Sequence, residues 1–343
     1  MALVIRVVTA SALTLLLTAA GLGCEVPGDL DEASPADATE EQAWKRRPRD
    51  AGVKDSAATT DAGAGVDAGS SAEGGAGTDA GSSSDAGSIA GPCLSAPSAC
   101  GLPDATNTGA RGTLTVVQGD VTLATAGAVF ENKDVRGCIR VTAPNVTIRN
   151  VKATCGGFYV IDYAPSGAGT LTIEDTTVVC TNPRATGIGE AQLAVRRVDV
   201  SSCENGFDID RNALIEDSYC HDLTPESGAT ADAHTDCVQG IMTNDVVIRH
   251  NSLLAPYYAT SAIEGDCGSC SNVRTGWVVE GNLLNGGGYP LYCATRSSES
   301  GSIVRNNRFG PGGWNAPAYA TGCTDTAWSG NVRDATGAPL AAQ

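Results

Sequence analysis

Two of the chain's three histidines, His221 and His234, fall within one short stretch, HDLTPESGATADAHTDCVQG. An imidazole titrates near neutral pH, and a neighbouring carboxylate such as Asp236 can orient it and raise its pKa. The stretch therefore predicts general acid or base chemistry by His221 or His234. The alternative is a polar loop with structural histidines, which is how we interpret His250.

The same stretch also contains residue types that bind metal ions. His221, His234 and Asp236 could form a site of two histidines and one carboxylate. Asp222, Asp232 and Asp236 could instead hold Ca²⁺ through their oxygens. Since the spacing is specific for neither arrangement, Ca²⁺ is the one cofactor that the sequence suggests, and a site without metal is the alternative.

A repeat in the sequence indicates the elements that would position these groups. Short apolar runs recur, mostly every 20 to 25 residues, and each is centred on one anchor residue: Ile148, Ile173, Val195, Ile215, Ile248, Val279, Val304 and Trp328. Such a period is typical of a solenoid, in which each rung buries its apolar face against its neighbours. The last four repeats place an asparagine three residues after the anchor, which predicts a ladder of Asn251, Asn282, Asn307 and Asn331.

A second strand is predicted in each of four successive rungs. Alternation along these strands points one set of side chains inward: Phe207, Val238, Ile263 and Leu291. The same alternation points the next set outward: Asp208, Gln239, Glu264 and Tyr292. Two rungs also carry insertions, one of which is the histidine stretch, and inserted loops commonly build the binding face of a solenoid. We expect an extended sugar-chain groove here; a solvated sheet face is the alternative.

At this point the sequence resembles the right-handed parallel β-helices of the pectate-lyase-like superfamily, over roughly residues 104–334. The resemblance implies an all-β solenoid of about eight rungs. It also implies a carbohydrate-related role, because the superfamily contains polysaccharide lyases, glycoside hydrolases, sugar epimerases and non-catalytic adhesins. Pectate lyases use a basic Arg or Lys as the base. Lys133 and Lys152 lie several rungs away, which leaves Arg211 as the candidate here.

These observations predict a protein that binds and cleaves an extracellular polysaccharide. The first expectation is β-elimination on a uronic-acid glycan, with His234 or His221 removing the proton. The second is hydrolysis by paired carboxylates, for example Asp208 with Asp210 or Glu264. A surface adhesin that binds carbohydrate without cleaving it is the rival from another class.

The N-terminus predicts export. Residues 1–23 have one Arg, an apolar run and small residues before Cys24, as in a secretory signal. The Gly-Leu-Gly-Cys sequence resembles a bacterial lipobox, which implies lipidation of Cys24 and a position at the cell surface or outer membrane; simple secretion is the alternative. Residues 24–92 are rich in Ala, Gly, Ser and Asp and predict a disordered tether before a β-helix domain at 93–343.

The number of cysteines and the net charge indicate in which compartment the protein acts and which partners it can bind. The chain has 13 cysteines, so 12 remain without Cys24, and an even number in an exported chain predicts disulfides. Cys155 and Cys180 both follow their anchors by seven residues, and we expect them to be bonded across adjacent rungs. The net charge of −17 disfavours nucleic acid and anionic membrane surfaces as partners. We expect a monomer that meets the membrane only through its lipid anchor.

Overall fold

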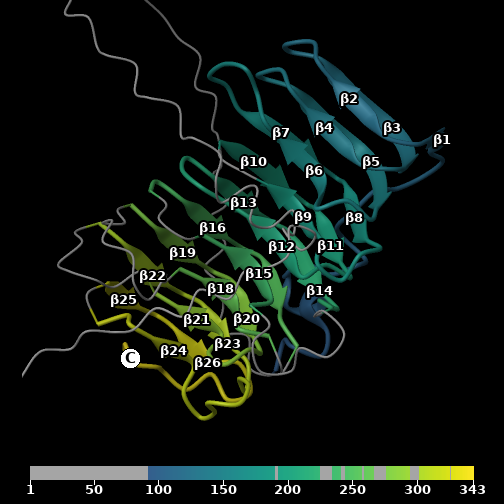
Figure 1. The fold of residues 1–343 in the computed structure, drawn as a ribbon. Helices are drawn as coiled ribbons and strands as arrows, with labels where there is room; N and C mark the ends of the chain where they lie inside the picture. The colour runs from purple at the N-terminus through teal and green to yellow at the C-terminus, as the bar shows by residue number, and fades with distance from the viewer. Residues whose placement is uncertain are drawn as a thin grey trace, which may run out of the picture. The chain divides into compact units, whose positions relative to one another are not determined.

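The computed structural model describes residues 92–189, 192–224, 234–240, 244–256, 259–265, 276–293, 301–324 and 326–343. These residues form an all-β parallel solenoid, in which short strands stack side by side (Figure 1). Apart from the 3-10 helix η1 (Pro97–Cys100), its regular elements are strands. No helix among the described residues is long and apolar enough to cross a membrane. The predicted signal peptide, Cys24 and the tether up to residue 91 lie outside the described residues.

Each complete rung contributes strands to three stacks, which we call the first, second and third stack in chain order. The first stack contains β3 (Val129–Arg136), β5 (Thr147–Cys155), β7 (Leu171–Glu174), β10 (Leu193–Arg196), β13 (Leu214–Glu216), β16 (Val247–Arg249), β19 (Val278–Glu280), β22 (Ile303–Arg305) and β25 (Ala327–Ser329), and β3 and β5 continue past the turn into the second stack. The second stack contains β1 (Thr115–Gln118), β8 (Thr177–Cys180), β11 (Asp199–Ser201), β14 (Tyr219–His221), β17 (Ser252–Leu254), β20 (Leu283–Asn285), β23 (Arg308–Phe309) and β26 (Val332–Arg333). The third stack contains β2 (Val121–Leu123), β4 (Ile139–Val141), β6 (Tyr159–Tyr163), β9 (Thr186–Gly189), β12 (Asn205–Asp208), β15 (Asp236–Gln239), β18 (Ser261–Glu264), β21 (Leu291–Tyr292) and β24 (Ala320–Thr321).

The eight predicted anchors all lie in the first stack and pair in parallel register, from Ile148 opposite Ile173 to Val304 opposite Trp328. Phe130 of β3 continues this column, so the described first stack has nine strands where the repeat predicted about eight rungs. Strand β1 pairs with the part of β3 that follows the Asn132 turn and therefore belongs to the second stack. From Ile148 to Val304 the anchors are at most 3% exposed. Their burial against one another is the main stabilising contribution of each rung.

The turn between the first and second stacks is the same in every rung. Its central residue adopts a left-handed backbone with φ between 48° and 66° at Asn132, Asn150, Asp175, Arg197, Asp217, His250, Gly281, Asn306 and Gly330. Asn, Asp and Gly tolerate this conformation better than other residues, which explains the turn residues that punctuate the repeat. His250 is one of these turn residues, as its structural interpretation requires.

The asparagine ladder follows these turns and is confirmed. The side-chain oxygen of Asn282 accepts hydrogen bonds from the backbone and side-chain N–H groups of Asn251, both at 2.9 Å. The Asn282 amide in turn donates to the Ile248 carbonyl at 2.9 Å and to Asn307 at 3.0 Å, and the same pattern reaches Asn331. The ladder satisfies buried backbone groups at the turn, where no strand partner is available.

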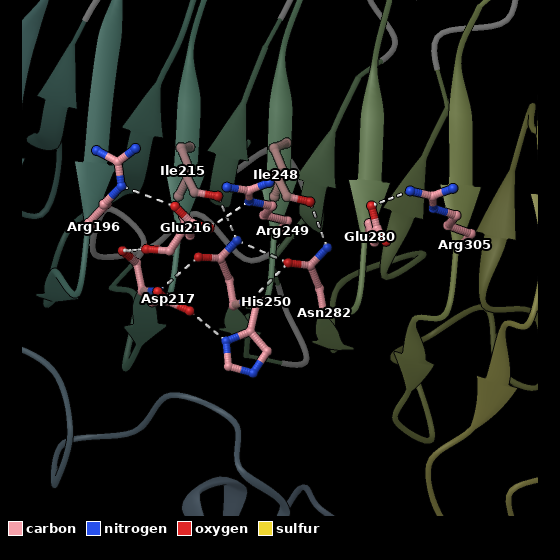
Figure 2. A network of polar contacts seen from close by, with 12 residues as sticks. Arg196, Ile215, Glu216, Asp217, Ile248, Arg249, His250, Glu280, Asn282 and Arg305 are labelled. Carbon is pink, nitrogen blue, oxygen red and sulfur yellow. Dashed lines mark hydrogen bonds and ion pairs between the residues drawn. The ribbon is translucent and has the colours of Figure 1, made fainter. Parts of the chain in front are cut away.

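The outer side of the first stack carries a column of alternating charge. In register, its members are Glu131, Arg149, Glu174, Arg196, Glu216, Arg249, Glu280 and Arg305. Glu216 is bonded to Arg196 at 3.0 Å and to Arg249 at 2.6 Å, as Figure 2 shows. Exposed ion pairs each add little stability. The column therefore serves mainly to specify which strands pair. A strand that skipped one rung would face a strand with a like charge at this position.

Residues 92–112 lie beside the second stack and reach from the final rung back to β5. The Cys93 N–H donates to Asp334, after the last strand, whereas the Arg111 N–H donates to Asn150 in β5. Between them, the Gly109 N–H donates to the Arg197 carbonyl. At the other end of the chain, the Leu340 N–H donates to the Asn331 carbonyl, so the C-terminal tail packs on the final rung.

The disulfides correct one prediction. Cys155 and Cys180 are register neighbours on β5 and β8, as expected, but they are not bonded to each other. Cys155 is bonded to Cys138 and Cys180 to Cys203. Side chains at one register on neighbouring parallel strands project side by side about 4.8 Å apart, whereas a disulfide needs Cβ atoms about 3.8 Å apart. Each cysteine instead bonds to one in the turn of an adjacent rung.

Candidate functional site

The third stack positions the predicted polar row. Asp208 pairs with Gln239, Gln239 with Glu264, and Glu264 with Tyr292, so four consecutive strands place these side chains at one register. We call these four residues the polar row. The apolar partners predicted to point inward are at most 1% exposed: Phe207, Val238, Ile263 and Leu291. The register and the apolar face predicted for these strands are therefore correct.

The members of the polar row differ in burial and in environment. Asp208 accepts a hydrogen bond of 2.9 Å from the Tyr159 hydroxyl, and the Tyr159 ring lies over Gly189, where a side chain would collide with it. Glu264 is 6% exposed. Burial, followed by the charge of Glu264, raises the pKa of Tyr292 to about 12, so its hydroxyl remains a hydrogen-bond donor at neutral pH.

Asp236 begins β15 and is fully buried beside the row. Its Oδ1 accepts a hydrogen bond of 2.7 Å from the Ser261 hydroxyl, while its Oδ2 has no hydrogen-bond partner among the described residues. Burial raises the pKa of Asp236 to about 7, and the hydrogen bond from Ser261 only partly opposes this effect. Asp236 lies on the same face of β15 as the inward-pointing Val238, so its carboxyl group faces the interior and stays protonated to a higher pH than that of an exposed aspartate.

His221 does not join the polar row. It lies in β14 of the second stack, with its Nε2 3.0 Å from Asp199, its Nδ1 2.7 Å from Asp222, and its ring stacked on Tyr219. Burial alone would lower the pKa of His221, but the hydrogen bonds to the two carboxylates raise it. Because both ring nitrogens are engaged, this geometry leaves no free nitrogen to remove a proton from a ligand.

The predicted loop is closed at its base by a disulfide between Cys220 in β14 and Cys237 in β15. His234 is exposed and lies two residues before β15, and residues 225–233 are outside the described part of the chain. Arg211 follows β12, where its guanidinium is 3.6 Å from the carboxylate of Asp210 and both side chains are exposed. The described residues thus do not bring His234 or Arg211 into contact with the row.

The proposed calcium ligands are not brought together either. Asp222 is largely exposed beside His221, Asp236 is buried in the third stack, and Asp232 lies outside the described residues. Within the described ranges, no group of three or more His, Cys, Asp or Glu side chains is arranged to hold a metal ion.

Sequence reasoning missed the aromatic residues at both ends of the polar row. Tyr159 contacts Asp208 from two rungs earlier in the third stack's order. At the other end, Tyr289 packs edge-on against Tyr292 with ring centroids 5.3 Å apart, and Trp314 is 47% exposed. The signal that could have identified the latter pair is the glycine-rich sequence before each residue, GGGY and GPGGW, because glycine permits close approach of backbones.

The chain matches no protein-family model, no curated protein and no solved structure. The class of the protein comes from its own fold and site, which are an all-β parallel solenoid with a polar and aromatic row on its third stack.

Proposed function

We propose that the third stack binds an extracellular polysaccharide along the polar row and that the carboxylates there cleave it. The observation that carries this proposal is the register of Asp208, Gln239, Glu264 and Tyr292 on consecutive parallel strands. Neighbouring strands are about 4.8 Å apart, so a linear ligand lying along the solenoid axis would meet one row residue at each such step. A chain of sugars, with hydroxyl groups on every unit, suits such a row.

Hydrolysis is the reaction that the row favours. Asp208 and Glu264 are two strands apart, which places their Cα atoms about 10 Å from each other. In inverting glycoside hydrolases, two carboxyl groups about 6.5–9.5 Å apart leave room for a water molecule. One carboxylic acid protonates the departing glycosidic oxygen, and the other carboxylate takes a proton from the water that attacks the anomeric carbon.

β-elimination is less well supported by the same residues. It needs a base beside the substrate and positive charge to stabilise the developing negative charge. His221 is engaged through both nitrogens on the second stack, and the third-stack column from Gly189 to Thr321 contains no Lys or Arg. We therefore treat β-elimination and binding without cleavage as alternatives to hydrolysis, which the test below distinguishes.

We also propose that the solenoid is a right-handed β-helix of the pectate-lyase-like type and that it acts outside the cell. The five disulfides of the described residues support an oxidising compartment. Anchoring through a lipidated Cys24 would place the solenoid at the cell surface. Labelling of the expressed chain with a radioactive fatty acid, with Cys24→Ser as the control, tests the anchor.

The test of the function uses the mature chain with a panel of neutral, amino-sugar and uronic polysaccharides. Release of reducing ends measures hydrolysis, and ultraviolet absorbance of unsaturated products measures β-elimination. Asp208→Asn and Glu264→Gln should each lower the rate at least about a hundredfold, the usual contribution of a positioned acid or base. Glu280→Gln, a carboxylate change on the first stack, should leave it unchanged.

Each result then has one meaning. Reducing ends without absorbance, lost in both row variants, support the proposal. Absorbing products would replace hydrolysis by a lyase reaction, and binding without any product would replace it by an adhesin. If no polysaccharide binds, the proposed function is wrong.

A further inference from the structure

Two glycine-rich loops precede the last two strands of the third stack and lie directly against each other. Residues 286–290 lead into β21, and residues 310–319 lead into β24. The Asn315 N–H donates to the Gly288 carbonyl at 3.3 Å. A Cβ atom added to Gly313 would collide with the carbonyl of Gly287, so only glycine allows this approach. The contact fixes the position of the second loop above the first.

This contact brings Trp314 and Tyr292 together over Gly288, and Tyr289 packs beside Tyr292. A Cβ atom on Gly288 would be 2.3 Å from the indole nitrogen of Trp314 and 2.8 Å from the hydroxyl of Tyr292. Tyr289 packs edge-on against Tyr292 with centroids 5.3 Å apart. We call Tyr289, Tyr292 and Trp314 the aromatic platform. It lies at the β21 end of the polar row, because Tyr292 belongs to both.

The platform exposes apolar surface on an ordered part of the chain. Trp314 is 47% exposed, and it is one of only three large hydrophobic residues in the described ranges that are exposed, with Val116 and Val129. Exposed apolar surface beside polar groups is typical of a binding site. Tryptophan and tyrosine combine a flat apolar ring with a polar edge, so they suit a ligand that has an apolar face and hydroxyl groups at its rim.

The charge next to the platform selects among such ligands. Glu264 pairs in register with Tyr292 and is 6% exposed, and the charges of Glu264 and Asp236 both act on the Tyr292 hydroxyl. Carboxylates accept hydrogen bonds from sugar hydroxyl or amino groups. A uronic acid would instead place a like charge beside Glu264, which is unfavourable without a cation.

We propose that the aromatic platform is a sugar subsite, in which Trp314 stacks on a pyranose that carries no acid group, while Tyr292 and Glu264 bond its hydroxyl or amino substituents. This inference rests on the proposed function and narrows its substrate class. It places one subsite at the β21 end of the row and extends the ligand from there towards Asp208.

Binding of defined oligosaccharides to the full mature chain tests the subsite. The probes are neutral, amino-sugar and uronic oligosaccharides of equal length, and calorimetry gives Kd while tryptophan fluorescence reports on the indole. Neutral or amino-sugar chains should bind and change the fluorescence. Trp314→Ala should weaken binding roughly tenfold to a hundredfold, the range for loss of an aromatic contact. Trp314→Phe should retain part of the affinity, and Val129→Ala, an exposed apolar residue on the first stack, should retain all of it.

A second variant acts on the position of the ring without removing it. Gly288→Ala places a methyl group where the Trp314 and Tyr292 edges now lie, and we expect it to weaken binding by a similar factor while the chain remains folded by circular dichroism. If neutral chains bind and are cleaved but Trp314→Ala and Gly288→Ala leave Kd unchanged, the subsite is wrong and the proposed function stands. Tighter binding of uronic chains would overturn the substrate class. If no oligosaccharide or polysaccharide binds, both proposals fail.

Discussion

Substitution of Asn282 by alanine gives the sharpest test of the fold. Asn282 is fully buried, and its side chain takes part in four hydrogen bonds, two with Asn251, one with Asn307 and one with the Ile248 carbonyl. Alanine leaves the Asn251 backbone N–H without its acceptor and removes one donor from the Ile248 carbonyl. Each buried group that loses its partner costs about 1–3 kcal/mol, so we expect Asn282→Ala to lower the free energy of unfolding by about 4 kcal/mol.

Thermal and denaturant unfolding, with the disulfides intact, measure this loss. For a domain of this size, about 4 kcal/mol corresponds to a fall in Tm of roughly 10 °C. Asn315→Ala, at an exposed loop position, is the control and should leave Tm unchanged. Because Asn251 and Asn282 share two hydrogen bonds, the double variant should cost less than the sum of the single variants. A loss below about 1 kcal/mol, or strict additivity, would refute the view that the ladder holds the rungs together.

Three further outcomes follow from the described contacts. Asp236 has a folded-state pKa near 7, well above its unfolded value of 3.8, so it destabilises the fold progressively as pH rises from about 4 to 7; Asp236→Asn should remove this part of the pH dependence of unfolding. The pKa of His250 is raised, chiefly by its 2.6 Å hydrogen bond to Asp217, so its contribution is fully present below about pH 6.5 and is lost as pH rises through the folded-state pKa; His250→Gln should destabilise the chain more at pH 6 than at pH 9 in matched unfolding curves. Peptide mapping without reduction should recover Cys155 bonded to Cys138, and a Cys155 peptide bonded to any other cysteine would contradict the structure.

Much of the fold could be predicted because each rung of a solenoid repeats the same local structure. Each rung needs one apolar strand residue and one turn residue that tolerates positive φ, and the last four rungs add a buried asparagine that bonds the turn. The apolar residue and the turn residue recur in every rung from Ile148 onward, mostly 20 to 25 residues apart, and the buried asparagine recurs in the last four rungs, so the sequence periodicity alone predicts which residues stack. Strand β1 escaped prediction because its residues are largely exposed and lack the apolar alternation of the later repeats.

The candidate site was harder to predict, because spacing along the chain does not tell which stack a side chain joins. His221 and Asp236 are close in sequence, but the chain turns from the second to the third stack between them, and the two side chains end in different environments. The disulfide between Cys155 and Cys180 was predicted wrongly for a related reason. Register predicts which cysteines are neighbours, but it does not predict whether their side chains have the geometry to form a bond. The aromatic platform depends on contact between two loops from different rungs, which no single repeat reveals.

The same chain treats carboxylates differently on two of its faces, and this difference supports the location of the site. On the first stack, glutamates alternate in register with arginines. On the third stack, Asp208 and Glu264 are followed in register by Gln239 and Tyr292, and the fully buried Asp236 lies beside them. Burying a carboxyl group costs stability, as the raised pKa of Asp236 reflects. On the third stack, Arg140 and Asp162 form such a pair before the row, but the row itself places Gln239 and Tyr292 in register with its carboxylates, so the cost of burying them falls where a ligand, rather than the fold, would use them.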